Sequence, residues 1–285
     1  MKIYEDHNLK ENKVPAIFHN VRPRYITDRT IIGNPANWHE NIELLHIYNG
    51  SGIVSINEEF LYVNAGDIVV INSNCIHYCI ATSENFSYHC LIFDRQFCIS
   101  NGVDTSAISF EQSFKDDRIG SLMTSLATLW KAPDPPEFKE LKIKSMILQI
   151  LEHICFDHRN KNAYTINVND SNKLNTVKLA IEYINKFYSR DISLTDVAQH
   201  VEVSQYYLAH IFKNITGHTF LTYLTRVRCD AAKKLLANTT LSISEISSNC
   251  GFQNPSYFAK KFKSLYNILP LQYRNQTVSK KITLP

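Results

Sequence analysis

One sequence pattern occurs twice in the C-terminal part of the chain, and it restricts the possible fold more than any other feature. The first copy, SLTDVAQHVEVSQYYLAHIFK, spans 193–213, and the second, SISEISSNCGFQNPSYFAKKFK, spans 242–263. Each copy opens with a serine followed three residues later by Asp196 or Glu245, which is the capping-box signature of a helix start. We therefore predict a short helix, a tight turn and a second helix in both copies.

The second helix of each copy is predicted to be amphipathic. Apolar residues recur at three-to-four spacing and predict its buried side, at Leu208, Ile211, Phe212, Phe258 and Phe262. The opposite side is polar and basic, as expected of a helix that enters the major groove of DNA. The residues predicted to bind DNA are Ser204, Gln205, Tyr206, His210, Lys213, Asn254, Ser256, Tyr257, Lys260, Lys261 and Lys263.

A further helix is predicted between the two copies, over 220–237. Its expected apolar stripe consists of Leu221, Leu224, Ala231, Leu235 and Leu236. A helix of this length spans about 27 Å, and adjacent major-groove faces lie about 34 Å apart. The two second helices are therefore expected to contact one face of a DNA duplex.

These features together resemble the DNA-binding domain of the AraC family of transcription regulators. The resemblance is carried by the two motifs, by LTYLTRVRCDAAKKLL between them and by the closing run GFQNPSYFAKKFKSLYNILPLQYR. Two departures lie in the turns: Glu202 stands where a glycine is preferred, and Asn267 and Leu269 stand where the family usually has Gly and Thr. Because asparagine tolerates a left-handed backbone, we expect the second turn to be kept.

The family resemblance carries functional expectations. It implies a non-enzymatic transcription regulator that binds double-stranded DNA, responds to a small-molecule effector for which a sugar is the family-level candidate, forms a homodimer and contacts RNA polymerase. The charge distribution fits this picture, since 1–160 hold 14 Lys/Arg against 20 Asp/Glu (net −6) and 161–285 hold 16 against 7 (net +9). A basic half suits phosphate binding, and an acidic half suits another task.

The cysteines and the chain's apolar stretches bear on the compartment. The seven cysteines lack the spacing of a disulfide framework, and Cys75 and Cys79 are expected to be buried apolar side chains rather than a metal or redox pair. The opening MKIYEDHNLKENK has no apolar core, and no run of apolar residues is long enough to span a bilayer. We therefore expect a cytoplasmic protein without a membrane segment.

The first hundred residues are predicted to form short strands of a barrel or sandwich. Turn signals separate them at Asn49-Gly50, Asn57-Glu58 and Asn64-Ala65-Gly66. The candidate strands are 42–48, 52–56, 59–63, 66–71 and 87–93.

Two sequences in this region, NWHENIELLHIYNG and GDIVVINSNCIH, resemble the two motifs of a cupin. The resemblance implies that Asn37, His39, Glu43 and His77 occupy the four ligand positions of metal-binding cupins. The amide at Asn37 is a poor ligand for a transition metal. The usual Pro and Gly of the second motif are replaced by Asn72 and Asn74.

We assign no cofactor and no resident metal, and we predict that the effector contacts Trp38, His39, Glu43 and His77. Two alternatives remain open. His39, Glu43 and His77 are candidate metal ligands, and the histidines are also consistent with structural side chains at the mouth of the barrel. Trp38 is a candidate stacking surface, although a single tryptophan more often belongs to a core.

Two helices are predicted over 110–131 and 137–158, separated by prolines, and the polar stretch 159–172 is predicted to be a linker. The family resemblance implies that these helices form the dimer contact. The alternative is that they pack only against the barrel.

The expected fold is an all-β cupin-like barrel with appended helices followed by an all-α domain. Its expected parts are an effector-sensing barrel, a helical dimerisation and coupling segment, a linker and a DNA-binding domain, over 1–109, 110–158, 159–172 and 173–285. The functional alternative is a metal-dependent cupin enzyme with an accessory DNA-binding domain.

Overall fold

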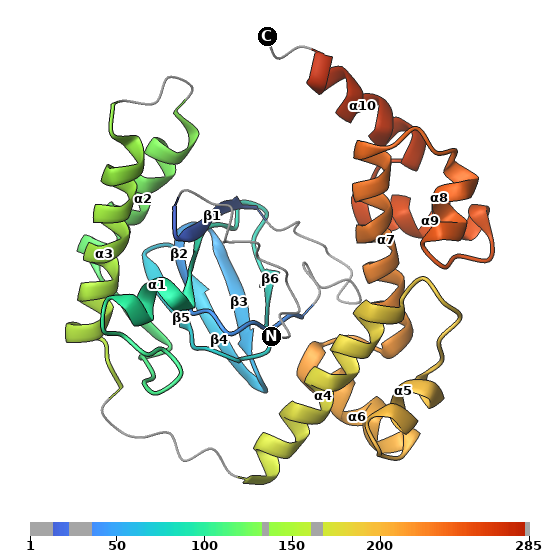
Figure 1. The fold of residues 1–285 in the computed structure, drawn as a ribbon, viewed down its shortest axis with the longest axis horizontal. Coiled ribbons are helices and arrows are strands. Elements are labelled where there is room, and N and C mark those ends of the chain that lie inside the picture. The colour runs from blue at the N-terminus through green and yellow to red at the C-terminus, as the bar shows by residue number, and fades with distance from the viewer. Residues whose placement is uncertain (1–13, 23–35, 133–136, 161–167, 283–285) are drawn as a thin grey trace. The chain divides into compact units, whose positions relative to one another are not determined.

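The computed structural model describes residues 14–22, 36–132, 137–160 and 168–282. The chain divides into two compact units, Met1–Ser171 and Asn172–Pro285 (Figure 1). The first is built around β-sheets and the second is helical, which confirms the predicted fold class.

The described strands of the first unit form two antiparallel sheets. The larger sheet has the order β1 (Ala16–Val21), β7 (Ser87–Phe93), β2 (Glu43–Asn49), β5 (Asp67–Ile71) and β8 (Ser113–Lys115). The smaller sheet has the order β4 (Glu59–Asn64), β3 (Ser51–Ile56) and β6 (His77–Ala81). The five predicted strands are present with bounds shifted by at most one residue, whereas β1, β6 and β8 had not been predicted.

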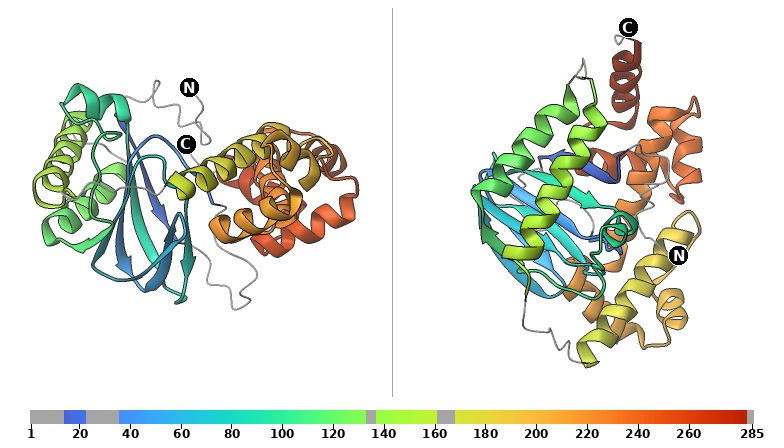
Figure 2. Two further views of the ribbon diagram at one scale, coloured as in Figure 1. Left: turned by 90° about the horizontal axis from the view of Figure 1, so that it is seen from below. Right: turned by 60° about the vertical axis from the view of Figure 1, so that its left-hand side comes forward.

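Successive side chains of β2 point to opposite faces of the larger sheet and belong to two different hydrophobic cores. Leu45 and Ile47 belong to a buried cluster that joins strands of both sheets, whereas Leu44 belongs to a second cluster that joins the larger sheet to the helices. These helices are α1 (Arg95–Ser100), α2 (Asp117–Lys131) and α3 (Lys139–Asp157). The long helices α2 and α3 lie side by side against the outer face of the larger sheet (Figures 1 and 2).

The prediction of a helix over 110–131 was wrong for its first residues. Helix α2 begins only at Asp117, because the Asp116 carboxylate caps it by accepting from the N–H groups of Arg118 and Ile119. The preceding residues form β8, which pairs with β5. Helix α1 had not been predicted, and α3 lies within the range expected for the second helix.

The second unit consists of seven described helices. They are α4 (Val168–Phe187), α5 (Leu194–His200), α6 (Gln205–Thr216), α7 (Phe220–Asn238), α8 (Ile243–Asn249), α9 (Pro255–Tyr266) and α10 (Pro270–Ile282). Helix α7 runs between the α5–α6 pair and the α8–α9 pair (Figure 1). Helix α4 begins inside the stretch that had been predicted as a linker.

Both predicted capping boxes form, with Ser193 and Ser242 as the N-caps of α5 and α8. One residue of the stripe predicted for α7 is misplaced: Leu221 is 61% exposed, and Tyr223 is fully buried instead. The Tyr223 ring meets Phe212 of α6 edge to face at 5.3 Å, so the interior side of α7 is rotated relative to the prediction. No helix among the described residues is long and apolar enough to cross a membrane.

Candidate functional site

The two helix pairs of the second unit have the same local construction. Ser204 caps α6 by accepting from the Tyr207 N–H at 3.2 Å. Asn254 caps α9 by accepting from the N–H groups of Ser256 and Tyr257 at 2.8 and 3.1 Å. Both side chains therefore fix the start of a second helix, and any contact that Ser204 and Asn254 make with DNA is additional to this role.

Helices α6 and α9, the second helices of the two pairs, are amphipathic as predicted. The apolar sides of α6 and α9 are buried, at Leu208, Ile211, Phe212, Phe258 and Phe262. The predicted DNA-binding side chains on the opposite sides are exposed, at Gln205, Tyr206, His210, Lys213, Ser256, Tyr257, Lys260 and Lys263. Tyr206 is the most open of these aromatic residues, with 85% of its surface exposed.

Several of the exposed side chains have partners within the unit. The Gln205 amide oxygen accepts from the Thr195 hydroxyl at 3.1 Å, which ties α6 to α5. Lys261 is half-buried, and its ammonium lies 5.5 Å from the centre of the Tyr257 ring. These contacts hold Gln205 and Tyr257 in defined positions on the surface of α6 and α9.

The turns of the two helix pairs use the same left-handed backbone conformation. Gly251 has a φ of 82° and Glu202 a φ of 57°. A Cβ atom at Gly251 would lie 2.7 Å from the Tyr188 carbonyl oxygen, so glycine is required there. Glu202 adopts the conformation at an energetic cost that a glycine would avoid.

In the first unit, three predicted site residues converge from two sheets. His39 precedes β2, Glu43 begins β2 and His77 begins β6. The Nε2 atoms of both histidines lie 3.1 Å from the Glu43 Oε2 atom, and the three side chains are buried. All three candidate ligand atoms lie within 4.8 Å of one another. We refer to His39, Glu43 and His77 as the His–Glu–His cluster.

Hydrogen bonds to the main chain determine which imidazole nitrogens face Glu43. His39 Nδ1 contacts the Asn41 carbonyl oxygen at 2.9 Å, and His77 Nδ1 contacts the Cys75 carbonyl oxygen at 3.0 Å. A carbonyl oxygen only accepts, so both Nδ1 atoms carry a hydrogen. A neutral ring then presents the Nε2 lone pair to the carboxylate, and this contact requires a cation, either a proton on the ring or a metal ion.

The histidines also determine the charge of Glu43. Burial alone would raise the pKa of this carboxyl, but the charges of His77 and His39 and their hydrogen bonds outweigh it and hold the pKa well below its usual value. Glu43 is therefore ionised at neutral pH. A carboxylate flanked by two Nε2 atoms whose Nδ1–H groups are held by carbonyl oxygens fits a transition metal such as Zn²⁺, with a coordination sphere that three protein ligands leave open.

A fourth polar side chain, that of Cys90, contacts the His–Glu–His cluster, and the sequence did not predict it. The Cys90 thiol, on β7, donates to the Glu43 Oε1 atom at 3.1 Å. The only signal that could have suggested this contact is that the Cys90 side chain lies on the inner face of β7. Which residues of β7 lie on that face is known only once the strand register is known. Asn37 exchanges two main-chain hydrogen bonds with His77, at 3.1 and 2.9 Å. Trp38 is buried, with 8% of its surface exposed.

Comparisons with known proteins place both units in families. Residues 29–135 match the model of an AraC-like ligand binding domain, and residues 197–276 match a helix-turn-helix domain. An HTH-type transcriptional regulator encoded in the cgkA 5′ region of Pseudoalteromonas carrageenovora is 31% identical over 176 residues, which cover 62% of this chain and 93% of that protein. This chain belongs to the AraC family of transcription regulators.

Two further relatives match to different extents. The regulatory protein PocR of Salmonella typhimurium is 40% identical over 100 residues, which are 35% of this regulator and 33% of PocR, so the match spans about a third of PocR. The lactose operon transcription activator of Staphylococcus xylosus is 24% identical over 241 residues, which are 81% of this regulator and 83% of that protein. The matched ligand-binding region of this AraC-family regulator includes the whole His–Glu–His cluster.

Proposed function

We propose that a small polar effector binds at the His–Glu–His cluster and controls DNA binding by the second unit. The buried Glu43 carboxylate is the observation that carries this proposal. Burying a carboxylate with two imidazoles costs free energy that an apolar core would not, and such arrangements are concentrated at functional sites. The cluster also lies in the region that matches a ligand-binding domain.

The effector class that we propose is a sugar. A sugar presents hydroxyl groups that donate to a carboxylate and to the lone pair of an imidazole Nε2 atom, and Glu43, His39 and His77 offer these acceptors. The name of the Staphylococcus xylosus relative, a lactose operon transcription activator, supports this class. Trp38 is the proposed apolar neighbour of the sugar.

The proposed assembly is a cytoplasmic homodimer that contacts RNA polymerase at promoters. Exposed apolar residues of α3 support the dimer: Leu141 is 66% exposed and Phe156 is 81% exposed. In this proposal 1–109 form the sensor, 110–158 the dimerisation and coupling segment, 159–172 the connection and 173–285 the DNA-binding domain. Sedimentation of a Leu141→Glu variant tests the dimer, because a charge at the interface should give monomers.

Helices α6 and α9 are each proposed to carry two groups of DNA-contacting residues, one for the bases and one for the phosphates. Gln205, Tyr206 and His210 on α6, and Ser256, Tyr257 and Lys260 on α9, are the proposed base readers. Lys213, Lys261 and Lys263 are the proposed phosphate contacts, since they lie further along α6 and α9. Replacing a base reader should cost about 1–3 kcal/mol and relax preference at one base pair. Uniform losses on all DNA sequences from both groups would contradict the division.

A second candidate function is metal-dependent chemistry in the first unit. The contact between two imidazole Nε2 atoms and Glu43 favours it, because these three groups would hold a divalent metal and supply a Lewis acid or an activated water. Metal analysis of the purified protein, with and without added Zn²⁺, tests this candidate. Stoichiometric metal that is lost in Glu43→Gln, together with turnover of a substrate, would favour the enzyme over the regulator.

The proposed regulatory function is tested by measuring the effector response and the DNA affinity separately. A thermal-shift screen with sugars and small metabolites first identifies a stabilising compound. The double variant His39→Ala, His77→Ala should then lose the response of promoter binding to that compound, while its DNA affinity in the absence of the compound should equal that of the parent. The exposed His19 on β1, changed to Ala, is the matched control. An unchanged response in the double variant would place the effector elsewhere.

A further inference from the structure

A short loop, residues 72–76, contacts both histidines of the His–Glu–His cluster. Its Cys75 carbonyl oxygen holds His77 Nδ1 at 3.0 Å. The Asn74 N–H donates to the His39 carbonyl oxygen at 2.9 Å. Asn74 has a left-handed backbone, with a φ of 65°, which directs its N–H toward His39. A change in the position of either histidine therefore acts directly on this loop.

The first residue of the same loop binds a distant part of the chain. The Asn72 amide donates to the Phe110 carbonyl oxygen at 3.1 Å and accepts from the Phe110 N–H at 2.8 Å. A single side chain thereby replaces the paired hydrogen bonds that a neighbouring strand would make. Phe110 is buried in the core that joins the larger sheet to α2 and α3, so its main chain has little freedom to move independently of Asn72.

Phe110 in turn lies in a strip that contains the last residues described before α4. The Glu111 N–H donates to the His158 carbonyl oxygen, and the Asn160 N–H donates to the Ser109 carbonyl oxygen, both at 2.9 Å. Phe110 and Arg159 form an antiparallel bridge between these two bonds. Residue 160 is the last one described before the chain continues toward α4. We call 109–111 with 158–160 the exit strip.

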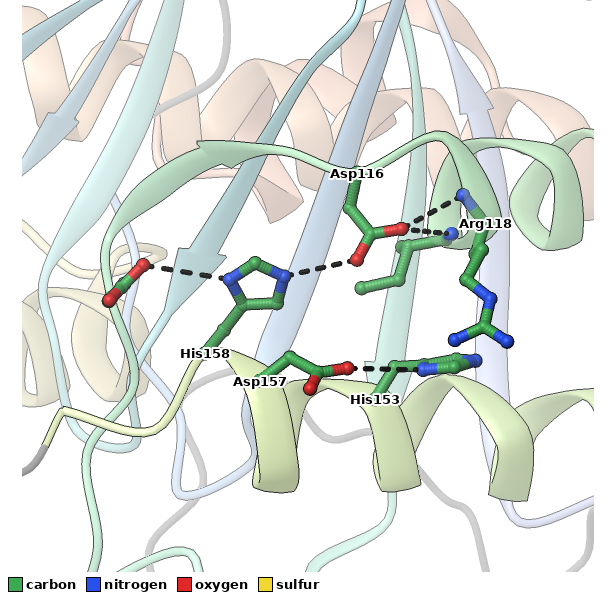
Figure 3. A network of polar contacts seen from close by, with 7 residues as sticks. Asp116, Arg118, His153, Asp157 and His158 are labelled. Carbon is green, nitrogen blue, oxygen red and sulfur yellow. Dashed lines mark hydrogen bonds and ion pairs between the residues drawn. The ribbon is translucent and has the colours of Figure 1, made fainter.

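The His158 side chain fastens the exit strip to α2. Its ring stacks on Phe114 with a centroid distance of 3.5 Å, and its Nε2 lies 3.1 Å from the Asp116 Oδ2. Its Nδ1 lies 3.5 Å from a Glu111 carboxylate oxygen. Asp116 also caps α2 through the N–H groups of Arg118 and Ile119, so one carboxylate joins the cap and His158 (Figure 3).

We propose that Asn72 transmits the state of the His–Glu–His cluster to the exit strip, which contains the last residues described before α4. The proposal rests on the proposed function of the cluster as the effector site. Occupancy that shifts His39 or His77 moves the loop, Asn72 moves with it, and the hydrogen bonds of Phe110 carry the displacement into the exit strip. Asn72 is a positioning residue that contacts the strip and not the effector.

The experiment uses the full chain and needs no identified effector. Glu43→Gln perturbs the cluster with little change in volume, and hydrogen exchange at the Glu111 and Asn160 amides reports on the exit strip. Glu43→Gln should change these exchange rates about fivefold or more, the lower end of ordinary coupling between sites. In an Asn72→Ala background the same change should have less than about a twofold effect. Global unfolding in urea is measured for each protein.

A matched control separates transmission from loss of stability. Asp94→Ala also removes a side-chain hydrogen bond to the main chain, the one to the Phe97 N–H at 2.8 Å, and should leave the effect of Glu43→Gln intact. If Asn72→Ala fails to fold, Asn72→Asp replaces it under the same criterion, because it keeps the acceptor for the Phe110 N–H and loses the donor.

The outcomes distinguish this proposal from the proposed function. An effect of Glu43→Gln that is equal with and without Asn72, or absent in both, overturns the transmission through Asn72. In that case the double histidine variant can still lose its effector response, and the proposed function stands. A retained effector response in the histidine variant overturns the proposed function, whatever the exchange rates show.

Discussion

At the scale of single residues, several turns of this protein place a side chain where glycine is the ordinary choice. Glu202, Asn74 and Asn267 all have a positive φ, near 60°. The asparagines tolerate this conformation because their short side chains bond locally, whereas a glutamate has no such compensation. The sequence predicted the kept turn at Asn267, and the structure confirms it.

Replacing Glu202 with glycine should therefore stabilise the second unit. The relief of the left-handed strain exceeds the added flexibility of the unfolded chain, and a gain of about 0.5–1 kcal/mol is expected. The urea midpoint of the helical unit measures it. Thr240→Gly is the control, because Thr240 is also exposed but has no positive φ, and this change should destabilise. Equal losses from both changes would show that Glu202 is not strained.

The buried His89 makes stability depend on pH. Burial, together with the charges of His46 and Lys131, lowers its pKa to about 4. The unfolded chain, with an ordinary histidine pKa near 6.5, binds this proton more readily. Stability contributed by neutral His89 is thus present above about pH 6.5 and is lost as the pH falls toward about 4, by about 1–3 kcal/mol.

The variant His89→Asn tests this dependence. At pH 7 it should be less stable than the parent, because the ring stacks on Tyr48 at 4.4 Å. The difference in unfolding free energy between parent and variant should shrink as the pH falls to 4.5. His19→Asn, an exposed histidine on β1, should show no such trend. A difference that is constant with pH would mean that His89 has the same pKa in the folded and unfolded states, which would contradict the prediction.

At the scale of elements, the periodicity of apolar residues predicted where helices form more accurately than it predicted which side of each helix is buried. Helix α7 was predicted with nearly its observed bounds, but Leu221 was placed on the buried side. The reason is that α7 contacts elements on several sides, so apolar residues such as Tyr223, Val227 and Cys229 are buried outside a single stripe. A stripe derived from one face cannot distinguish these sides without the positions of the partners.

This correction gives a direct test on α7. Leu221→Ser should change the unfolding free energy by less than about 0.5 kcal/mol, because the side chain is already in water. Tyr223→Ser should cost about 3–5 kcal/mol, since it empties a fully buried site against Phe212. Both are measured by urea unfolding of residues 172–285. Similar losses from the two changes would support the stripe predicted from sequence.

At the scale of the whole molecule, the order of the parts could be predicted because each has its own local pattern. Capping boxes and paired stripes identify the helix-turn-helix motifs, and turn signals identify most strands. The resemblance to the two cupin motifs placed His39, Glu43 and His77 at ligand positions, and the structure brings their ligand atoms within 4.8 Å of one another. Contacts such as Cys90 to Glu43 and Asn72 to Phe110 were not predictable, because they depend on strand register and on loop paths between residues distant in sequence.

The charge asymmetry between the halves yields the last prediction. Residues 161–285 carry a net charge of +9, so residues 172–285 alone should bind promoter DNA with an affinity that falls steeply with salt. Each phosphate contact contributes about −0.9 to the slope of log K against log salt. Lys263→Ala should therefore reduce the slope by about 1 and weaken binding to all sequences alike. Lys260→Ala should instead relax the preference for particular bases. Footprints of the parent should show two sites one helical turn apart, and no retardation of any promoter DNA at low salt would contradict a DNA-binding role for this unit.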